Sequence, residues 1–224
     1  MAANDRPYRL EPASETDPTT LLLAHGTGGD EHDLVPLGAR LAPGAALLSP
    51  RGTVREGGAN RFFARHAEGV FDVADLDARA QELATWVREA CAAHDRPLEG
   101  LLGLGFSNGA NILWAVAAHD PTLLRGAVLL APMLPLTPAQ QPDLDGLPVL
   151  IGAGRADPIA PPDQAEALAA WLRDRGAQVE LRWHEGGHQP GAAVLDHAQR
   201  WLAEARAGLP AAGGAASRRV GGEA

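Results

Sequence analysis

Short apolar runs alternate with longer amphipathic stretches along most of this 224-residue chain, and no other feature constrains its fold as strongly. Apolar runs bounded by Gly and Pro predict strands that are buried on both faces. The amphipathic stretches between them predict helices that connect parallel strands. The sequence therefore predicts an α/β protein with a mostly parallel, twisted sheet and helices on both faces. The predicted strands are residues 19–26, 45–52, 98–106, 125–132, 147–154 and 178–185.

Helices are predicted where apolar residues recur at helical spacing. They cover residues 73–94, 108–119, 162–175 and 192–207. With 46% apolar residues, a chain of this length buries one sizeable core and is short for two. We therefore predict a lead-in over residues 1–18, a single domain over residues 19–207 and a disordered tail over residues 208–224, where the periodicity ends.

Charge and composition argue against several classes of function. All 19 basic residues are Arg, so chemistry that needs a lysine amine, such as a Walker loop or a Schiff base, is excluded. A formal net charge of −9 argues against nucleic acid and anionic membranes as partners. The single cysteine, Cys91, lies at an apolar position of a predicted helix and is expected to be a buried hydrophobe.

The sequence gives no sign of a membrane span or a secretion signal. No run of eighteen apolar residues is present, and residues 1–18 lack the basic and apolar regions of a signal peptide. We therefore expect a cytoplasmic protein without membrane insertion. Its oligomeric state stays open, with a homodimer among the alternatives.

The sequence Gly105-Phe-Ser-Asn-Gly109 has the form G-x-S-x-G and stands where a predicted strand meets a predicted helix. At such a turn the serine is raised above the carboxyl-terminal edge of the sheet, and the flanking glycines relieve crowding of the backbone. The N-terminus of the following helix points its amides at the same place. Ser107 is therefore a candidate nucleophile.

Two other interpretations of this turn have to be weighed. It is either a purely structural bend or a dinucleotide-binding loop like that of a nicotinamide-dependent oxidoreductase. The second is disfavoured because Gly103-x-Gly105-x-x-x-Gly109 is one residue too long for the usual fingerprint. The next predicted strand, residues 125–132, also lacks the acidic residue that would bind the ribose.

A serine nucleophile needs a base and an acid that orients the base, and in this fold class they follow in the order Ser, Asp, His. Asp157 lies in the loop after the predicted strand 147–154. His188 lies in a glycine turn after the predicted strand 178–185, just before the last helix. We therefore predict that Ser107, Asp157 and His188 form a catalytic triad.

Acyl transfer also needs hydrogen-bond donors for the developing oxyanion. The sequence His25-Gly-Thr-Gly-Gly29 follows the first predicted strand, and we assign the backbone N–H groups of Thr27 and Asn108 as these donors. His25 and His32 lie close to acidic residues, but no H-E-x-x-H or H-x-x-E-H spacing is present. We therefore predict a structural role for His25, no metal and no cofactor.

These motifs resemble the α/β-hydrolase superfamily, in the branch of small carboxylesterases and lysophospholipase-like acyl-thioesterases. The resemblance covers nearly the whole chain from Thr19 to Ala207. A bacterial sub-branch linked with aromatic or hydroquinone metabolism is similar in the blocks HGTGGDEHDLVPL, SPRGTVREGGANRFFARHAEGVFD, GFSNGANI, IGAGRADPIAPP and GGHQ. The resemblance implies an α/β-hydrolase fold and the triad and oxyanion donors named above. Dienelactone hydrolases are also similar, but they use cysteine at the position of Ser107.

The substrate class is inferred from the loops that are expected around the turn at Ser107, which is called the elbow below. Apolar residues in two of these loops predict a pocket wall. No insertion is long enough for a large helical lid. In the alternative interpretation, the two phenylalanines of the first loop pack inward and only close the domain. The predicted wall consists of Phe62, Phe63, Met133, Leu134 and Leu136.

Together these features predict a serine ester hydrolase that acts on small apolar or aromatic carboxylic esters through an acyl-enzyme. Acyl-thioesterase or lysophospholipase activity is the first alternative, although this elbow has Asn108 where that branch usually has Gln. A binding module that has the fold but no activity is the second. It is disfavoured because all three triad positions are filled.

Overall fold

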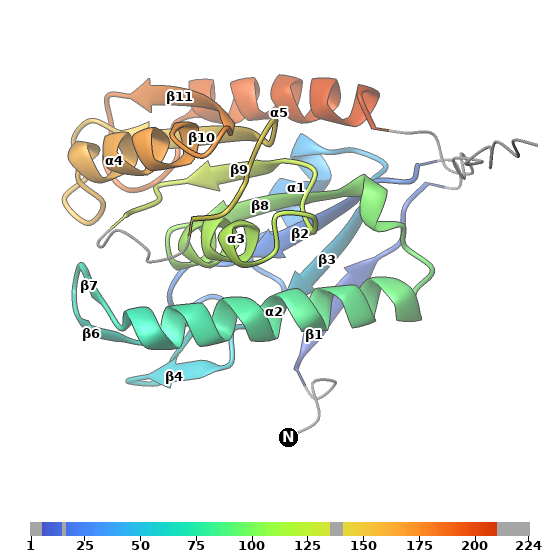
Figure 1. Ribbon diagram of the computed structural model, residues 1–224, viewed down its shortest axis with the longest axis horizontal. Helices are drawn as coiled ribbons and strands as arrows, with labels where there is room; N and C mark the ends of the chain where they lie inside the picture. Colours follow the sequence, from blue (N-terminus) through green and yellow to red (C-terminus); the bar gives the residue numbers. More distant parts are fainter. Residues whose placement is uncertain (1–5, 15–16, 135–140, 210–224) are drawn as a thin grey trace, which may run out of the picture.

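The computed structural model describes residues 6–14, 17–134 and 141–209. Within them, a seven-stranded sheet has the strand order β1-β3-β2-β8-β9-β10-β11 (Figure 1). All neighbouring strands are parallel except β1, which pairs antiparallel with β3. The strands are β1 (Tyr8–Glu11), β2 (Thr20–Ala24), β3 (Ala46–Pro50), β8 (Leu101–Phe106), β9 (Ala127–Leu130), β10 (Pro148–Gly154) and β11 (Gln178–His184).

Helices cover both faces of this sheet, as Figure 1 shows. Side chains of α2, α3 and α4 join one hydrophobic core, and side chains of α1 and α5 join a second core on the opposite face. This arrangement confirms the predicted α/β fold class with a mostly parallel sheet. The helices are α1 (Val35–Leu41), α2 (Val73–Ala93), α3 (Asn108–His119), α4 (Pro162–Arg173) and α5 (Ala192–Ala207), and a short 3-10 turn covers Leu98–Gly100.

All six predicted strands are present, and the four predicted helices match α2, α3, α4 and α5 within two residues at each end. Cys91 is buried, as expected. Strand β1 was not predicted and lies inside the segment that was interpreted as a lead-in. No bounds were predicted for the short helix α1, which lies between β2 and β3.

Two small hairpins occupy the connection between β3 and α2, which the sequence suggested to be a loop. They are β4 (Val54–Glu56) with β5 (Ala59–Arg61), and β6 (Arg65–Ala67) with β7 (Val70–Phe71). Both pairs are antiparallel. These hairpins bring the 51–72 segment against the carboxyl-terminal edge of the sheet, as the contacts described below show.

The rings of Phe62 and Phe63 lie in the first hydrophobic core, with 2% and 0% of their surface exposed. Phe63 packs edge-on against Phe71, with 4.8 Å between ring centroids. Such burial favours the alternative interpretation, in which these rings close the domain, over an exposed pocket wall. Residues 210–224 of the predicted tail lie outside the described residues, as does Leu136 of the predicted wall.

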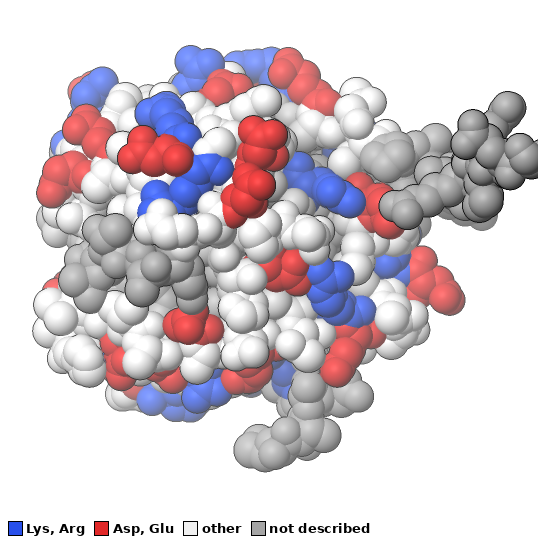
Figure 2. All heavy atoms as spheres, in the orientation of Figure 1, with Lys and Arg blue, Asp and Glu red and all other residues white. Residues whose placement is uncertain are grey.

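Charged side chains of both signs are interspersed on the face of the molecule in Figure 2. Ion pairs among the described residues include Arg88 with Asp120 and Arg79 with Glu82. This face therefore does not present one continuous basic surface. In the described part of the chain, no helix combines the length and the apolar character that crossing a bilayer requires.

Candidate active site

Ser107 sits on a sharp turn between β8 and α3, with φ 54° and ψ −114°. A side chain on either neighbouring glycine would prevent this turn. A Cβ atom at Gly105 would come within 2.5 Å of the Gly109 carbonyl oxygen, and one at Gly109 within 1.8 Å of the Ala24 carbonyl oxygen. The G-x-S-x-G spacing is therefore required sterically, because strand β8, helix α3 and the end of β2 meet here at backbone contact.

His188 and Asp157 lie beside this serine. The Nε2 atom of His188 is 2.9 Å from the Ser107 Oγ, and its Nδ1 atom is 2.8 Å from the Asp157 Oδ2. The Asp157 side chain is fully buried, and 16% of the His188 side chain is exposed. The structure thus joins the three residues of the predicted triad in one chain of hydrogen bonds.

The hydrogen bonds of Asp157 determine how the imidazole is used. Its Oδ1 accepts the backbone N–H groups of Ile159 and Ala160, at 2.8 and 2.9 Å, so the carboxylate is fixed within its own loop. Its Oδ2 accepts from the proton on Nδ1 of His188, because a carboxylate has no proton to donate. That tautomer leaves the Nε2 lone pair facing the Ser107 hydroxyl, as a general base requires.

The loop after β2 is the predicted source of an oxyanion donor. Strands β2 and β8 are parallel neighbours, with Ala24 paired to Gly105, so the residues that follow them emerge side by side. A Cβ atom at Gly109, in the first turn of α3, would also come within 2.6 Å of the carbonyl oxygen of His25. The backbone N–H groups of Thr27 and Asn108 therefore belong to two adjacent segments, and that of Asn108 is at a helix N-terminus without an intrahelical acceptor.

His25 is buried behind this loop. Its Nε2 accepts the backbone N–H of Gly52 at 3.0 Å, and its Nδ1 lies 2.7 Å from the carbonyl oxygen of Gly26. Both contacts fit a neutral ring with its proton on Nδ1. Burial lowers the pKa of His25 from its ordinary value, outweighing the backbone carbonyl and nearby carboxylates that act in the opposite direction. These contacts fit the structural role that the sequence predicted for His25.

Two asparagines of the elbow helix hold the loops on either side of Ser107. The Oδ1 of Asn108 accepts the backbone N–H of Phe62 at 2.7 Å, and the Oδ1 of Asn111 accepts that of Met133 at 2.8 Å. Both side chains are buried. Sequence reasoning assigned no role to Asn111. Its signal was the second amide in the sequence SNGAN, four residues after the serine and therefore one helical turn away.

Two further residues of the predicted pocket wall, Met133 and Leu134, lie at the edge of the first hydrophobic core. Met133 is 8% exposed, and Leu134 is half-buried against the first hydrophobic core. A Cβ atom at Gly69, in the turn between β6 and β7, would lie 3.8 Å from the end of the Met133 side chain. An aromatic residue that the prediction left out, Phe106, lies beside the triad, with its ring centroid 5.1 Å from that of His188.

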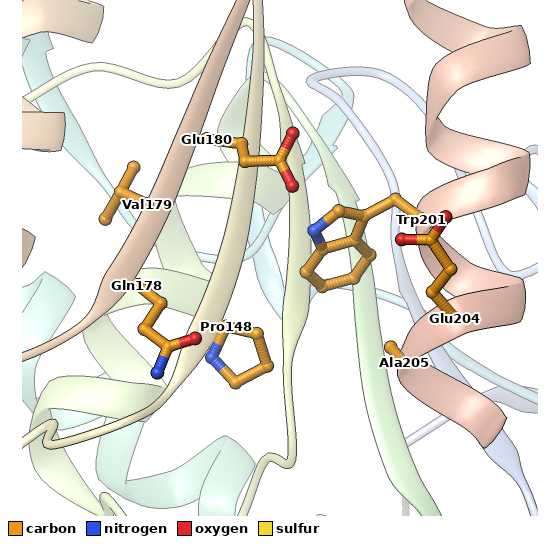
Figure 3. A pocket seen from close by; sticks show the side chains of 7 residues that line it. All are labelled: Pro148, Gln178, Val179, Glu180, Trp201, Glu204 and Ala205. Carbon is orange, nitrogen blue, oxygen red and sulfur yellow. The ribbon is translucent and has the colours of Figure 1, made fainter. Parts of the chain in front are cut away.

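A pocket elsewhere on the molecule is not part of this cluster. It lies between the starts of β10 and β11 and the second half of α5, with the Trp201 indole between them (Figure 3). Ser107 and His188 follow the opposite ends of their strands. The pocket is lined by Pro148, Gln178, Val179, Glu180, Trp201, Glu204 and Ala205.

The described residues include no group of three or more His, Cys, Asp or Glu side chains that is arranged to hold a metal ion. The acidic residue Glu31 near His25 is instead paired with Arg51, through contacts of 2.5 and 2.7 Å. The prediction that this protein uses no metal stays a prediction.

Known proteins resemble this chain along most of its length. The model of the dienelactone hydrolase family matches residues 80–190, which include Ser107, Asp157 and His188. MhqD of Bacillus subtilis (strain 168), named as a hydrolase, is 44% identical over 190 residues, which are 85% of this chain and 95% of MhqD.

Solved structures agree with this result. A carboxylesterase from Bacillus cereus is 38% identical with a TM-score of 0.86, and the match covers 90% of this chain and 95% of the esterase. A carboxylesterase from Mesorhizobium loti is 36% identical with a TM-score of 0.84, covering 89% and 96% of the two chains. The chain therefore belongs to the dienelactone hydrolase and carboxylesterase family of α/β-hydrolases, and it is a hydrolase.

Proposed function

We propose that this protein is a serine carboxylesterase that cleaves small apolar or aromatic esters through an acyl-enzyme. The observation that carries the proposal is the set of hydrogen bonds that links the side chains of Ser107, His188 and Asp157, with Ser107 at a strained turn. The names of the Bacillus cereus and Mesorhizobium loti relatives support ester cleavage. The matching family model is named for dienelactone hydrolases. The resemblance described in the sequence analysis implies a cysteine nucleophile in those enzymes, whereas this chain has Ser107 at that position.

The reaction follows from the geometry. His188 Nε2 takes the proton of the Ser107 hydroxyl while Oγ attacks the ester carbonyl carbon, and the carbonyl electron pair moves onto its oxygen. The backbone N–H groups of Thr27 and Asn108 donate to that oxygen. When the pair returns, the C–O bond to the alcohol breaks and the imidazolium protonates the leaving alkoxide. Water, deprotonated by the same imidazole, then releases the carboxylic acid and restores the serine.

Two variants test this assignment. Ser107→Ala is expected to abolish labelling by a fluorophosphonate and to lower the kcat for nitrophenyl butyrate by about 10⁴-fold or more. Asp157→Asn is expected to lower kcat by about 10³- to 10⁴-fold with a small change in KM, because the amide favours the wrong tautomer of His188. The measurements are steady-state kinetics and covalent labelling of purified variants.

Ser14 and Asp145 provide matched controls. Ser14 is an exposed serine that contacts the Gly44 carbonyl, and Asp145 is an exposed aspartate before β10. Ser14→Ala and Asp145→Asn are expected to retain wild-type kinetics. Unchanged turnover in Ser107→Ala would refute the proposal. Running butyryl thioester beside the oxygen ester decides between the carboxylesterase and the thioesterase alternative, because an enzyme of the second kind prefers the thioester by kcat/KM.

A further inference from the structure

Strand β5 braces the loop that carries Thr27. Asn60 contacts this loop twice: its carbonyl oxygen accepts the N–H of Gly28 at 2.9 Å, and its Nδ2 donates to the carbonyl oxygen of Gly29 at 2.8 Å. Two residues further on, the N–H of Phe62 donates to the Asn108 side chain. The two segments that supply the proposed oxyanion donors are thus both tied to residues 60–62, at the end of β5.

Arg61 lies between these two contacts and reaches the loop with its side chain. Its Nη1 donates to the Thr27 Oγ1 at 2.6 Å, and its Nε donates to the carbonyl oxygen of Phe63 at 3.1 Å. Only 3% of the side chain is exposed. A guanidinium that donates through both Nε and Nη1 cannot reorient without breaking a hydrogen bond in a buried site.

The positive charge of this guanidinium is incompletely balanced. Its acidic neighbour Glu56 lies 3.2 Å away, but 40% of that side chain is exposed, and it also pairs with Arg65. Burial, and then the charge of Arg65, lower the pKa of Arg61 from its ordinary value. An ion pair at the surface would avoid this desolvation. Burying the Arg61 charge beside Thr27 lowers the stability of the folded protein, which points to a function for the contact between them.

We propose that Arg61 is a positioning residue for the oxyanion hole, which acts by holding Thr27 through its hydroxyl. This inference rests on the proposed esterase function and deepens it. Asn60 holds Gly28 and Gly29 of this loop, whereas Arg61 contacts Thr27 itself, an exposed residue with a glycine on either side. Fixing Oγ1 restrains the residue, and its backbone N–H stays directed at the oxygen that becomes negative in the transition state.

The inference predicts a specific kinetic pattern. Arg61→Met and Thr27→Val are each expected to lower the kcat for nitrophenyl butyrate by about 10- to 100-fold, with KM within about threefold of wild type, because an oxyanion contact acts in the transition state. The kcat of the double variant is expected to be no lower than that of the more affected single variant, since both changes break the same contact between Arg61 and Thr27. Arg61→Lys, which keeps a donor, is expected to recover part of the loss.

A surface pair offers a matched control. Arg88 donates to the Thr122 Oγ1 at 2.9 Å, far from the site in the fold, so Arg88→Met and Thr122→Val remove the same kind of contact. Both are expected to retain wild-type kcat. Thr27→Val changes an exposed side chain, so it keeps the inference testable if Arg61→Met does not fold. The urea concentration at the midpoint of unfolding, measured for each variant, shows whether Arg61→Met has lost its fold.

Three results would overturn the inference. They are losses that multiply in the double variant, an effect confined to KM, and a loss that appears only with an anionic ester such as nitrophenyl hemisuccinate. The last would make Arg61 a carboxylate-binding residue instead. Failure of the underlying function is recognised separately, because it shows as turnover in Ser107→Ala, whereas failure of this inference leaves Ser107→Ala inactive and the Arg61 variants at wild-type kcat.

Discussion

The backbone of Ser107 has a conformation that a serine rarely adopts, and positive φ values of this kind cost about 1–3 kcal/mol. The surrounding contacts keep it in place. The Ser107 N–H donates to the carbonyl oxygen of Leu130 at 2.8 Å, and its own carbonyl accepts the N–H of Asn111 at 3.0 Å. Strain at one residue is thus balanced by a neighbouring strand and a helix, and the hydroxyl is held in front of His188.

A second residue-scale consequence concerns pH. Because the folded pKa of His25 lies below the unfolded value near 6.5, the unfolded chain binds more protons in the interval between them. The stability contribution of the neutral ring is therefore complete above pH 6.5 and is lost as the pH falls below it. His25→Asn, which keeps an acceptor for Gly52 but does not titrate, is expected to show a flatter decline of unfolding free energy between pH 7 and pH 5.

Urea denaturation at a series of pH values measures this difference. His66→Asn serves as the control, because His66 is exposed in the β6 strand. That variant is expected to follow the wild-type pH profile. Parallel profiles for wild type and His25→Asn would show that His25 does not contribute to the acid sensitivity of the fold.

At the scale of elements, the strands and helices with a strong apolar pattern could be predicted and the short ones could not. Strand β1 has only four residues and exposes half of them, so it has no buried run to detect. The β4–β5 hairpin did carry a signal. Gly57 and Gly58, with φ of 55° and 89°, form the two-residue turn that Gly-Gly favours, but the polar surroundings suggested a loop.

The same limit explains which residues of the candidate site could be predicted from the sequence. Ser107, Asp157 and His188 were predicted because each follows a recognisable strand in the expected order. Arg61 and Asn60 were missed because their partners lie more than thirty residues away in sequence and meet them only through the hairpin. Apolar residues near the elbow gave no indication of whether they face the core or the substrate.

Phe63 tests the two interpretations of that hairpin segment. Its ring is fully buried, so Phe63→Ala is expected to lower the free energy of unfolding by about 3–5 kcal/mol. The preference for acyl-chain length is expected to stay unchanged. Val70→Ala, in the adjacent hairpin at 51% exposure, is expected to change stability by less than about 0.5 kcal/mol. A shifted chain-length preference at unchanged stability would return Phe63 to the pocket wall.

At the scale of the whole molecule, the sheet gathers the site by its strand order. Parallel strands end at one edge, and five adjacent strands each deliver a residue there. These strands are β2, β8, β9, β10 and β11, and the residues that follow them are Thr27, Ser107, Met133, Asp157 and His188. Residues far apart in the chain thus converge without any long loop having to reach across the protein.

We expect this convergence to limit the size of the acyl group. Met133 lies three residues beyond Leu130, which bonds to Ser107, and its backbone is held by Asn111 and by the Trp114 indole. Because its backbone is held by these hydrogen bonds, Met133 cannot move far to make room for a longer acyl chain. Each buried methylene contributes about 0.8 kcal/mol, or roughly fourfold in kcat/KM, until the wall is reached. Activity on nitrophenyl esters is therefore expected to rise from acetate to butyrate or hexanoate and to be low for laurate.

Met133→Ala is expected to move this optimum to longer chains, because it removes the end of the side chain that faces the β6–β7 turn. Leu195→Ala, a truncation on the opposite face of the sheet, is expected to leave the optimum in place. The measurement is kcat/KM across the ester series for wild type and both variants. A steady rise to laurate in the wild type, or the same optimum in Met133→Ala, would show that the acyl chain lies along another part of this edge.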